Sequence, residues 1–289
     1  MPGLLKPVSS SVRANLDFLD PKLEEKPFAF LGIPPEGQSA TNIEPYPIEL
    51  DIADLRAVND YEKEFTVEKT GFQIVQHTST KLDGLDDKEG MDAYCKETEE
   101  LLRATLPGAK RVHIFNQTIR KKKHDAPFNG PTRTPENTGP VARAHVDNTA
   151  ASGARRVFLE MGDDAEALSK GRCQIINVWR PISHPAQDCP LTYMDYRSLD
   201  PKNLIKTDLI LSNEGNRKGE NYSLTYNPEQ KWYFLSDMTP QECVVFKIYD
   251  SLNQPGISQL TPHSAFVNPT APADALPRQS IEVRALVFY

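Results

Sequence analysis

Residues 173–195 read CQIINVW, then RPISHPAQDCP, then LTYMD: a short apolar run, a proline-containing turn segment, and a second short run. Runs of this length, bounded by turn residues, are typical of strands. Similar runs lie on both sides of this stretch, at 142–146, 209–211, 222–226, 232–235, 243–249 and 281–289. Only 163–170 among them has helical spacing. The pattern therefore predicts a mainly β protein with flanking helices, built as a double-sheet jelly-roll or a barrel.

The segment before these runs has a different character. Residues 1–45 contain many prolines and few periodic apolar positions, which predicts a proline-rich surface arm with little β structure. Apolar and polar residues alternate at 64–68 and again at 71–75, as in half-buried strands. A helix is expected next, with Asp86 at its start. No shift in composition marks a boundary, so residues 1–289 are expected to form a single domain.

Composition and charge exclude several classes of protein. Hydrophobic residues at 38% and charged residues at 25% exclude a disordered or collagen-like chain. The 33 basic and 40 acidic residues give a net charge of -7, which argues against nucleic-acid binding, and the basic run 120–124 is interpreted as solvated. No apolar run approaches the roughly 20 residues of a membrane span. We expect a cytoplasmic protein with no membrane partner, and free thiols at Cys95, Cys173, Cys189 and Cys243, which show no CxxC spacing.

The strongest local pattern is His145-Val-Asp147, at the end of an expected strand. Residues i and i+2 of a strand project from the same face, so this imidazole and this carboxylate can converge on one metal. His263 lies 263 minus 147, or 116, residues after Asp147 and could complete a two-histidine, one-carboxylate site. Such a site holds Fe(II) on one face and leaves positions open. The competing interpretation is that both histidines are half-buried residues of a β core.

Arg278 and Ser280 follow His263 in the chain and immediately precede the last expected strand. They share one strand face, so a guanidinium fork and a hydroxyl could bind one carboxylate together. The sequence therefore predicts a dicarboxylate site beside the metal site.

Six ordered blocks of the chain resemble a known family. They are AHVDN (144–148), GARR (153–156), NVWRP (177–181), KIYDS (247–251), PHSAF (262–266) and PRQSIEVRALVF (277–288). Together they resemble a mainly fungal secondary-metabolism family of Fe(II)/2-oxoglutarate-dependent oxygenases. Its members include hydroxylase/desaturases, and it is related to cephamycin methoxylation proteins and to endoperoxide- and aziridine-forming oxygenases. The resemblance extends over about residues 45–289.

The resemblance implies a double-stranded β-helix, the cupin-like jelly-roll, with Fe(II), 2-oxoglutarate and O2 as cofactors. It implies that His145, Asp147 and His263 bind the iron. Arg278, with Ser280 beside it, resembles the family's Arg-x-Ser, which pairs with the distal carboxylate of 2-oxoglutarate. Arg284 is a rival anchor, because it lies an even number of positions away on the same strand. We favour Arg278 because of its adjacent hydroxyl.

The implied reaction oxidises an unactivated C–H bond of a small molecule, a secondary metabolite or amino-acid-derived substrate, and releases succinate and CO2. Hydroxylation, desaturation and oxidative ring closure all stay open. Trp179, Arg180 and Arg156 are candidates for the substrate pocket, although Trp179 in a strand also fits a core position, with Arg180 stacked on it. Segments 125–140, a candidate lid, and 212–222 are expected to border the pocket.

Three alternatives stay open at this point. A cupin-like metalloenzyme that does not use 2-oxoglutarate would keep the triad but would have no use for Arg278 and Ser280. A zinc hydrolase could use the same three ligands without O2. A non-catalytic jelly-roll binding module would need none of them. The sequence does not indicate an oligomeric state.

Overall fold

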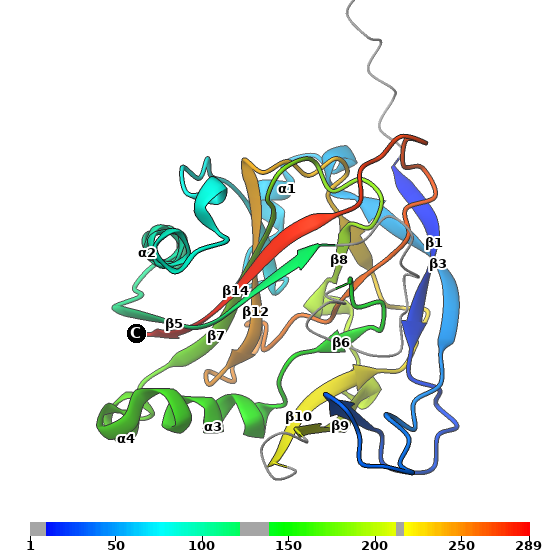
Figure 1. The fold of residues 1–289 in the computed structure, drawn as a ribbon, viewed down its shortest axis with the longest axis horizontal. Helices are drawn as coiled ribbons and strands as arrows, with labels where there is room; N and C mark the ends of the chain where they lie inside the picture. The colour runs from blue at the N-terminus through cyan, green and yellow to red at the C-terminus, as the bar shows by residue number, and fades with distance from the viewer. Residues whose placement is uncertain (1–9, 122–138, 212–216) are drawn as a thin grey trace, which may run out of the picture.

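The computed structural model describes residues 10–121, 139–211 and 217–289 of the chain (Figure 1). Within these residues the strands are β1 (Ser11–Phe18), β2 (Phe28–Leu31), β3 (Tyr46–Asp54), β4 (Phe72–Gln76), β5 (Arg111–Lys121), β6 (His145–Val146), β7 (Cys173–Pro181), β8 (Leu191–Met194), β9 (Leu204–Leu211), β10 (Arg217–Leu224), β11 (Trp232–Phe234), β12 (Glu242–Asp250), β13 (His263–Ala265) and β14 (Gln279–Phe288). The helices are α1 (Tyr61–Glu64), α2 (Lys88–Thr105), α3 (Ala150–Met161) and α4 (Ala165–Leu168). Short 3₁₀ turns lie at Leu55–Ala57, Leu82–Gly84, Gly162–Asp164, Tyr196–Ser198 and Pro201–Asn203.

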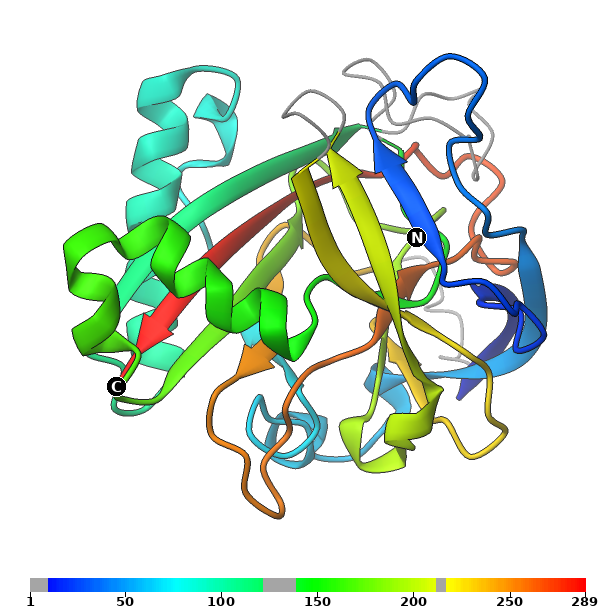
Figure 2. The ribbon, with the colours of Figure 1, turned by 90° about the horizontal axis from the view of Figure 1, so that it is seen from below.

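The strands of the described residues form two sheets. One has nine strands in the order β1-β3-β11-β8-β13-β6-β10-β9-β2, and the other has five in the order β4-β12-β7-β14-β5. Figures 1 and 2 both place α2, α3 and α4 at the end of the molecule that carries β5 and β14, with β1 and β3 at the opposite end. The expected mainly β jelly-roll with flanking helices is confirmed.

Strand β7 explains why the five-stranded sheet lies at the centre of the protein. All nine of its residues are buried, so both of its faces pack against apolar layers. Ile176 and Val178 pack on the outer side with Leu101 and Leu102 of α2. Residues of the other parity, such as Trp179, join the inner layer between the two sheets. The inner layer is where polar side chains from both sheets can meet.

Helix α2 covers the outer face of this sheet. Its buried residues Tyr94, Thr98, Leu101 and Leu102 recur at helical spacing and form one stripe. The helix begins one residue later than expected, because Asp87 and not Asp86 is the N-cap, accepting a hydrogen bond from the backbone of Gly90 at 2.8 Å. In the described part of the chain, no helix has both the length and the apolar character that crossing a membrane would require.

Two expectations about the N-terminal region are wrong. The arm 1–45 was expected to carry little β structure, but β1 pairs along its whole length with β3 and buries Leu16 and Phe18. Residues 64–68 do not form a strand, because the end of helix α1 and a turn occupy these positions. Phe65 and Val67 are nevertheless buried. In both segments, packing against strands distant in the chain decided the structure, and the local sequence pattern did not.

Two other expectations concern segments of which the structure describes little. Most of the candidate lid 125–140 and the first part of 212–222 lie outside the described residues. The single-domain organisation of 1–289 stays a prediction.

A buried charge cluster ties the end of β12 to neighbouring segments. The ammonium of Lys247 lies 2.7 Å from Asp250, and both side chains are fully buried. Arg172 also pairs with Asp250, at 2.5 Å, and reaches Glu68 at 2.8 Å. Burial acts against the charge of Asp250, but hydrogen bonds from Arg172, Gln174 and Lys247 keep its pKa below the usual range. The carboxylate thus compensates two cations at once.

We expect Asp250→Ala to lower the free energy of unfolding by about 3–5 kcal/mol, because it leaves Lys247 buried without its nearest counter-charge. Urea denaturation measures the change. The matched control is Glu99→Ala, which removes a carboxylate paired with Arg103 on the partly exposed surface of α2 and is expected to cost less than about 1 kcal/mol. Equal effects of the two substitutions would contradict the role given to the buried cluster.

Candidate metal centre and anion pocket

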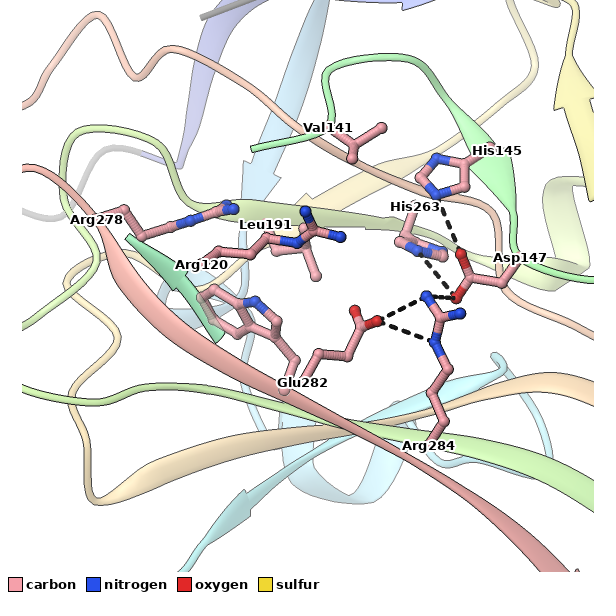
Figure 3. A pocket seen from close by; sticks show the side chains of 10 residues that line it. Arg120, Val141, His145, Asp147, Leu191, His263, Arg278, Glu282 and Arg284 are labelled. Carbon is pink, nitrogen blue, oxygen red and sulfur yellow. Dashed lines mark hydrogen bonds and ion pairs between the residues drawn. The ribbon is translucent and has the colours of Figure 1, made fainter. Parts of the chain in front are cut away.

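The nine-stranded sheet brings the two predicted histidines together. His145 on β6 and His263 on β13 are direct partners in the antiparallel register, and their ring centroids lie 4.5 Å apart. Opposite residues of an antiparallel pair carry their side chains on the same face, close enough to touch. Asp147 follows β6 by one residue, and ligand atoms of all three side chains lie within 4.8 Å of one another (Figure 3). These three residues could hold a metal ion.

The backbone sets the orientation of both imidazoles. Nδ1 of His145 lies 2.7 Å from the carbonyl oxygen of Arg143, and Nδ1 of His263 lies 3.1 Å from that of Thr261. A carbonyl oxygen can only accept, so each Nδ1 donates a proton. Nε2 of His145 lies 3.3 Å from Asp147 Oδ1. The two Nε2 atoms therefore face the carboxylate and are the nitrogens that could bind a metal.

Asp147 is held by the other sheet. Its Oδ2 accepts a hydrogen bond from Asn177 Nδ2 at 2.9 Å and lies 3.1 Å from Arg284 Nη2. Burial acts against the charge on this carboxylate, but Arg284, followed by His145 and His263, keeps its pKa well below the usual range. Asp147 is therefore charged at neutral pH and could act as a metal ligand.

A pocket opens beside the triad and extends toward the start of β14. The surface that lines it is mostly polar. The walls are formed by Arg120, Val141, His145, Asp147, Trp179, Leu191, His263, Arg278, Glu282 and Arg284 (Figure 3). A pocket this polar is suited to a small charged molecule.

Arg278 lies in this pocket, and only 1% of it is exposed. Its backbone N–H donates to Asp188 at 3.1 Å, but within the described residues no carboxylate pairs with its guanidinium, which bonds the carbonyl of Cys189 at 2.9 Å and leaves Nε unpaired. Burial, and then Arg120, lower its pKa to about 10. The hydroxyl of Ser280, two residues along, is also buried with no hydrogen-bond partner. Buried polar groups are nearly always bonded, so both point to an anion as their missing partner.

Arg284 has the opposite environment. Its guanidinium pairs with Asp147 at 3.1 Å and with Glu282 at 2.9 Å. Burial acts against its charge, but these two carboxylates raise its pKa above the usual range. The contrast with Arg278 supports the choice made between the two arginines, because Arg284 already has its counter-ions.

Sequence reasoning missed Arg120 and Glu282. Arg120 was assigned to a solvated basic run, yet it is the direct partner of Ser280 in the pairing of β5 with β14 and faces the pocket. Burial lowers its pKa. Only the register of β5 with β14 shows which face Arg120 occupies, because the apolar residues of β5 do not keep a single alternation along the strand. Asn177, which bonds Asp147, was likewise missed.

The substrate-pocket candidates had mixed outcomes. Trp179 lines the pocket, and Arg278 lies over its ring at 5.6 Å from the centroid. Arg180 does not line it and does not stack on Trp179, because successive strand residues face opposite sides. Its guanidinium instead bonds His77 behind the sheet, at 3.1 Å to the carbonyl. Arg156 is also outside the pocket lining and pairs with Glu160 on α3. Both arginines lie outside the lining of this pocket, and a role in substrate binding stays a prediction.

We expect the metal-free protein to lose stability in acid through His263. Burial, and then His145, lower the pKa of His263 to about 4, below its ordinary 6.5. As pH falls below 6.5 the unfolded chain binds this proton first, so stability present above pH 6.5 is lost as pH falls toward 4, by about 2–3 kcal/mol. Urea unfolding at several pH values measures the loss, and His263→Gln should remove this part of it. An imidazole of His263 titrating near 6.5 by NMR would contradict the expectation.

Comparison with known proteins agrees with this geometry. Residues 16–288 match the family described as Oxidoreductase/YMDC permease-like domain. Aspirochlorine biosynthesis protein N of Aspergillus oryzae is 41% identical over 152 residues, which span 52% of this chain and 63% of that protein, less than two thirds of its length. Hydroxylase/desaturase efuI of Hormonema carpetanum is 32% identical over 249 residues, 80% of this chain and 82% of that protein.

A solved structure extends the similarity to three dimensions. The iron and alpha-ketoglutarate-dependent endoperoxidase NvfI superposes with a TM-score of 0.83 at 26% sequence identity, over 96% of this chain and 98% of that one. The matched family, the relatives and the three converging side chains all indicate an iron-dependent oxidoreductase. The chain belongs to the fungal hydroxylase/desaturase family of Fe(II)/2-oxoglutarate-dependent dioxygenases, which use iron, 2-oxoglutarate and O2.

Proposed function

We propose that this dioxygenase oxidises an unactivated C–H bond of a secondary metabolite or an amino-acid-derived compound, with His145, Asp147 and His263 as its iron ligands. Arg278 and Ser280 hold the distal carboxylate of 2-oxoglutarate. The observation that carries the proposal is the pairing of a convergent triad with a buried, uncompensated arginine in one pocket.

The donor set fits Fe(II). Two imidazole nitrogens and one carboxylate oxygen form the facial arrangement that non-haem iron oxygenases use, and it leaves positions free on the opposite face. Bound iron supplies the oxidising chemistry, in which O2 is consumed and 2-oxoglutarate becomes succinate and CO2. The protein's part is to fix the three ligand atoms before binding, which the carbonyls of Arg143 and Thr261 do for the histidines.

The cosubstrate site is supported by charge. 2-Oxoglutarate carries two carboxylates, of which one binds at the metal and the other needs a cation. Arg278 offers a guanidinium fork and Ser280 a hydroxyl, and Arg120 adds a second, partly buried cation to the same pocket. A buried cation without a counter-ion is costly, so a bound anion stabilises it.

The remaining walls supply position and exclusion of water. Leu191 and Val141 add apolar surface beside the triad, and Trp179 closes the side next to Arg278. A pocket closed in this way holds a C–H bond at short range from the metal and keeps solvent from reacting instead. Relatives named as hydroxylase/desaturase and endoperoxidase support a secondary metabolite as the small-molecule substrate. The cytoplasmic location stays a prediction.

The alternatives fit this pocket less well. A cupin-like metalloenzyme without 2-oxoglutarate, a zinc hydrolase or a binding module would give no reason to bury Arg278 and Ser280 with their polar atoms unpaired. Dependence of O2 consumption on added 2-oxoglutarate separates them from the proposal.

We expect the purified protein to bind one Fe(II) per chain, and His145→Ala, Asp147→Ala and His263→Ala each to remove most of that binding. A site with only three protein ligands loses most of its affinity with any one of them. Iron content and succinate formation measure the effect. Wild-type iron content in all three variants would refute the assignment of the ligands.

We expect Arg278→Ala to raise the dissociation constant of 2-oxoglutarate by roughly 30-fold to several thousand-fold, because a carboxylate loses its charge-assisted bonds at about 2–5 kcal/mol. Iron content should not change, since Arg278 does not touch the triad. Ser280→Ala should weaken binding only about 2- to 10-fold. Calorimetry measures both, with Arg156→Ala as the matched arginine outside the pocket. Unchanged affinity in Arg278→Ala would contradict the placement of the anchor.

A further inference from the structure

The carboxylate of Asp147 lies where the two sheets meet. The nine-stranded sheet carries it, because Asp147 directly follows β6, but the hydrogen-bond donor and the arginine that contact its Oδ2 both come from the five-stranded sheet. Asn177 is on β7 and Arg284 is on β14. Its other oxygen, Oδ1, faces Nε2 of His145 at 3.3 Å. Oδ2 lies 4.0 Å from Nε2 of His263, so each oxygen of Asp147 faces a histidine, but Oδ2 also contacts two groups from the other sheet.

The two donors are fixed by the backbone. Asn177 and Arg284 are direct partners in the antiparallel pairing of β7 with β14. Cross-strand partners project on the same face, so their side chains reach Asp147 side by side. Neither depends on a loop for its position.

Glu282 orients the arginine. It lies two residues before Arg284 on the same face of β14, and its Oε1 accepts from Arg284 Nε at 3.2 Å and from Nη2 at 2.9 Å. With the planar guanidinium held at that edge, Nη2 also reaches Asp147 (Figure 3). The result is a chain of contacts from Glu282 through Arg284 to the ligand.

We propose that Asn177 and Arg284 restrict Asp147 to ligation through one oxygen. This inference rests on the proposed function. The hydrogen bond from Asn177 and the ion pair with Arg284 occupy Oδ2 and leave Oδ1 as the metal ligand. Asn177 and Arg284 are thus positioning residues that act through Asp147.

The consequence concerns the number of open positions on the iron. An octahedral site with three protein ligand atoms has three positions left, of which 2-oxoglutarate takes two and O2 the third. If both oxygens of Asp147 ligated, four positions would be filled, and 2-oxoglutarate would occupy the rest. By restricting Asp147 to one ligand oxygen, Asn177 and Arg284 keep the O2 position open while 2-oxoglutarate is bound.

The experiment uses nitric oxide as a stable stand-in for O2. Fe(II)-loaded wild type, Arg284→Met and Asn177→Leu are titrated with nitric oxide under anaerobic conditions, with and without saturating 2-oxoglutarate, and binding is followed by electron paramagnetic resonance. Without 2-oxoglutarate all three proteins should bind nitric oxide. With it, wild type should still bind about one per iron, and the variants should bind substantially less.

Iron affinity gives a second, independent measurement. Loss of the hydrogen bond from Asn177, or of the ion pair with Arg284, should weaken Fe(II) binding about 10- to 100-fold. Arg284→Lys, which keeps a cation near Asp147, should recover part of that affinity. Arg278→Met is the matched control, a buried arginine of the same pocket, which should keep its iron affinity and lose 2-oxoglutarate.

Folding is controlled by a further variant. Arg284→Met leaves Glu282 buried without its partner, so the double variant with Glu282→Gln removes that charge and should give the same nitric oxide result. Wild-type nitric oxide binding in every variant with 2-oxoglutarate present would overturn the inference. So would loss of 2-oxoglutarate affinity in Arg284→Met with iron affinity unchanged, since Arg284 would then be the cosubstrate anchor. A wild type that binds no iron would instead refute the proposed function.

Discussion

The register between β6 and β13 is the constraint on which the site depends. It places His145 opposite His263, and their imidazoles therefore lie on one face of the nine-stranded sheet, 4.5 Å apart. A shift of one residue in either strand would turn one ring to the other face and destroy the site, because side chains alternate with a period of two. The carbonyls of Arg143 and Thr261, each two residues before a histidine, belong to the same backbone geometry.

The two sheets have different roles around this pair. The nine-stranded sheet supplies the three candidate ligands, and the five-stranded sheet supplies the charged groups around them. Strand β14 contributes Glu282 and Arg284 next to Asp147, and the residue just before it, Arg278, reaches the far wall of the pocket. The two arginines therefore differ in their partners. Arg284, near the metal site, pairs with carboxylates, whereas the guanidinium of Arg278, where an anion is proposed to bind, has an unpaired Nε.

The sequence was informative where a residue type and its spacing in the chain indicated one kind of binding site. His145, Asp147 and His263 were found from ligand chemistry and strand periodicity, and Arg278 was preferred for its neighbouring hydroxyl. The sequence was not informative where the residue type did not show which face of the sheet a side chain occupies. Arg180 looked equivalent to Trp179 beside it, yet it faces α2, with its guanidinium 5.7 Å from the centroid of Tyr94. The arm 1–45 looked unstructured because prolines surround a strand whose partner, β3, comes later in the chain.

By itself the sequence predicted the class of fold and the candidate ligands from local periodicity and residue chemistry, and the resemblance of six ordered blocks to a known family implied the cosubstrate. Only the tertiary structure decided which arginine has no paired carboxylate within the described residues, that Arg120 faces the pocket, and that Asn177 and Arg284 contact the same oxygen of Asp147. These are properties of register and of burial between two sheets. They depend on residues more than a hundred positions apart coming within hydrogen-bond distance, as Asp147 and Arg284 do, and no local pattern encodes that approach.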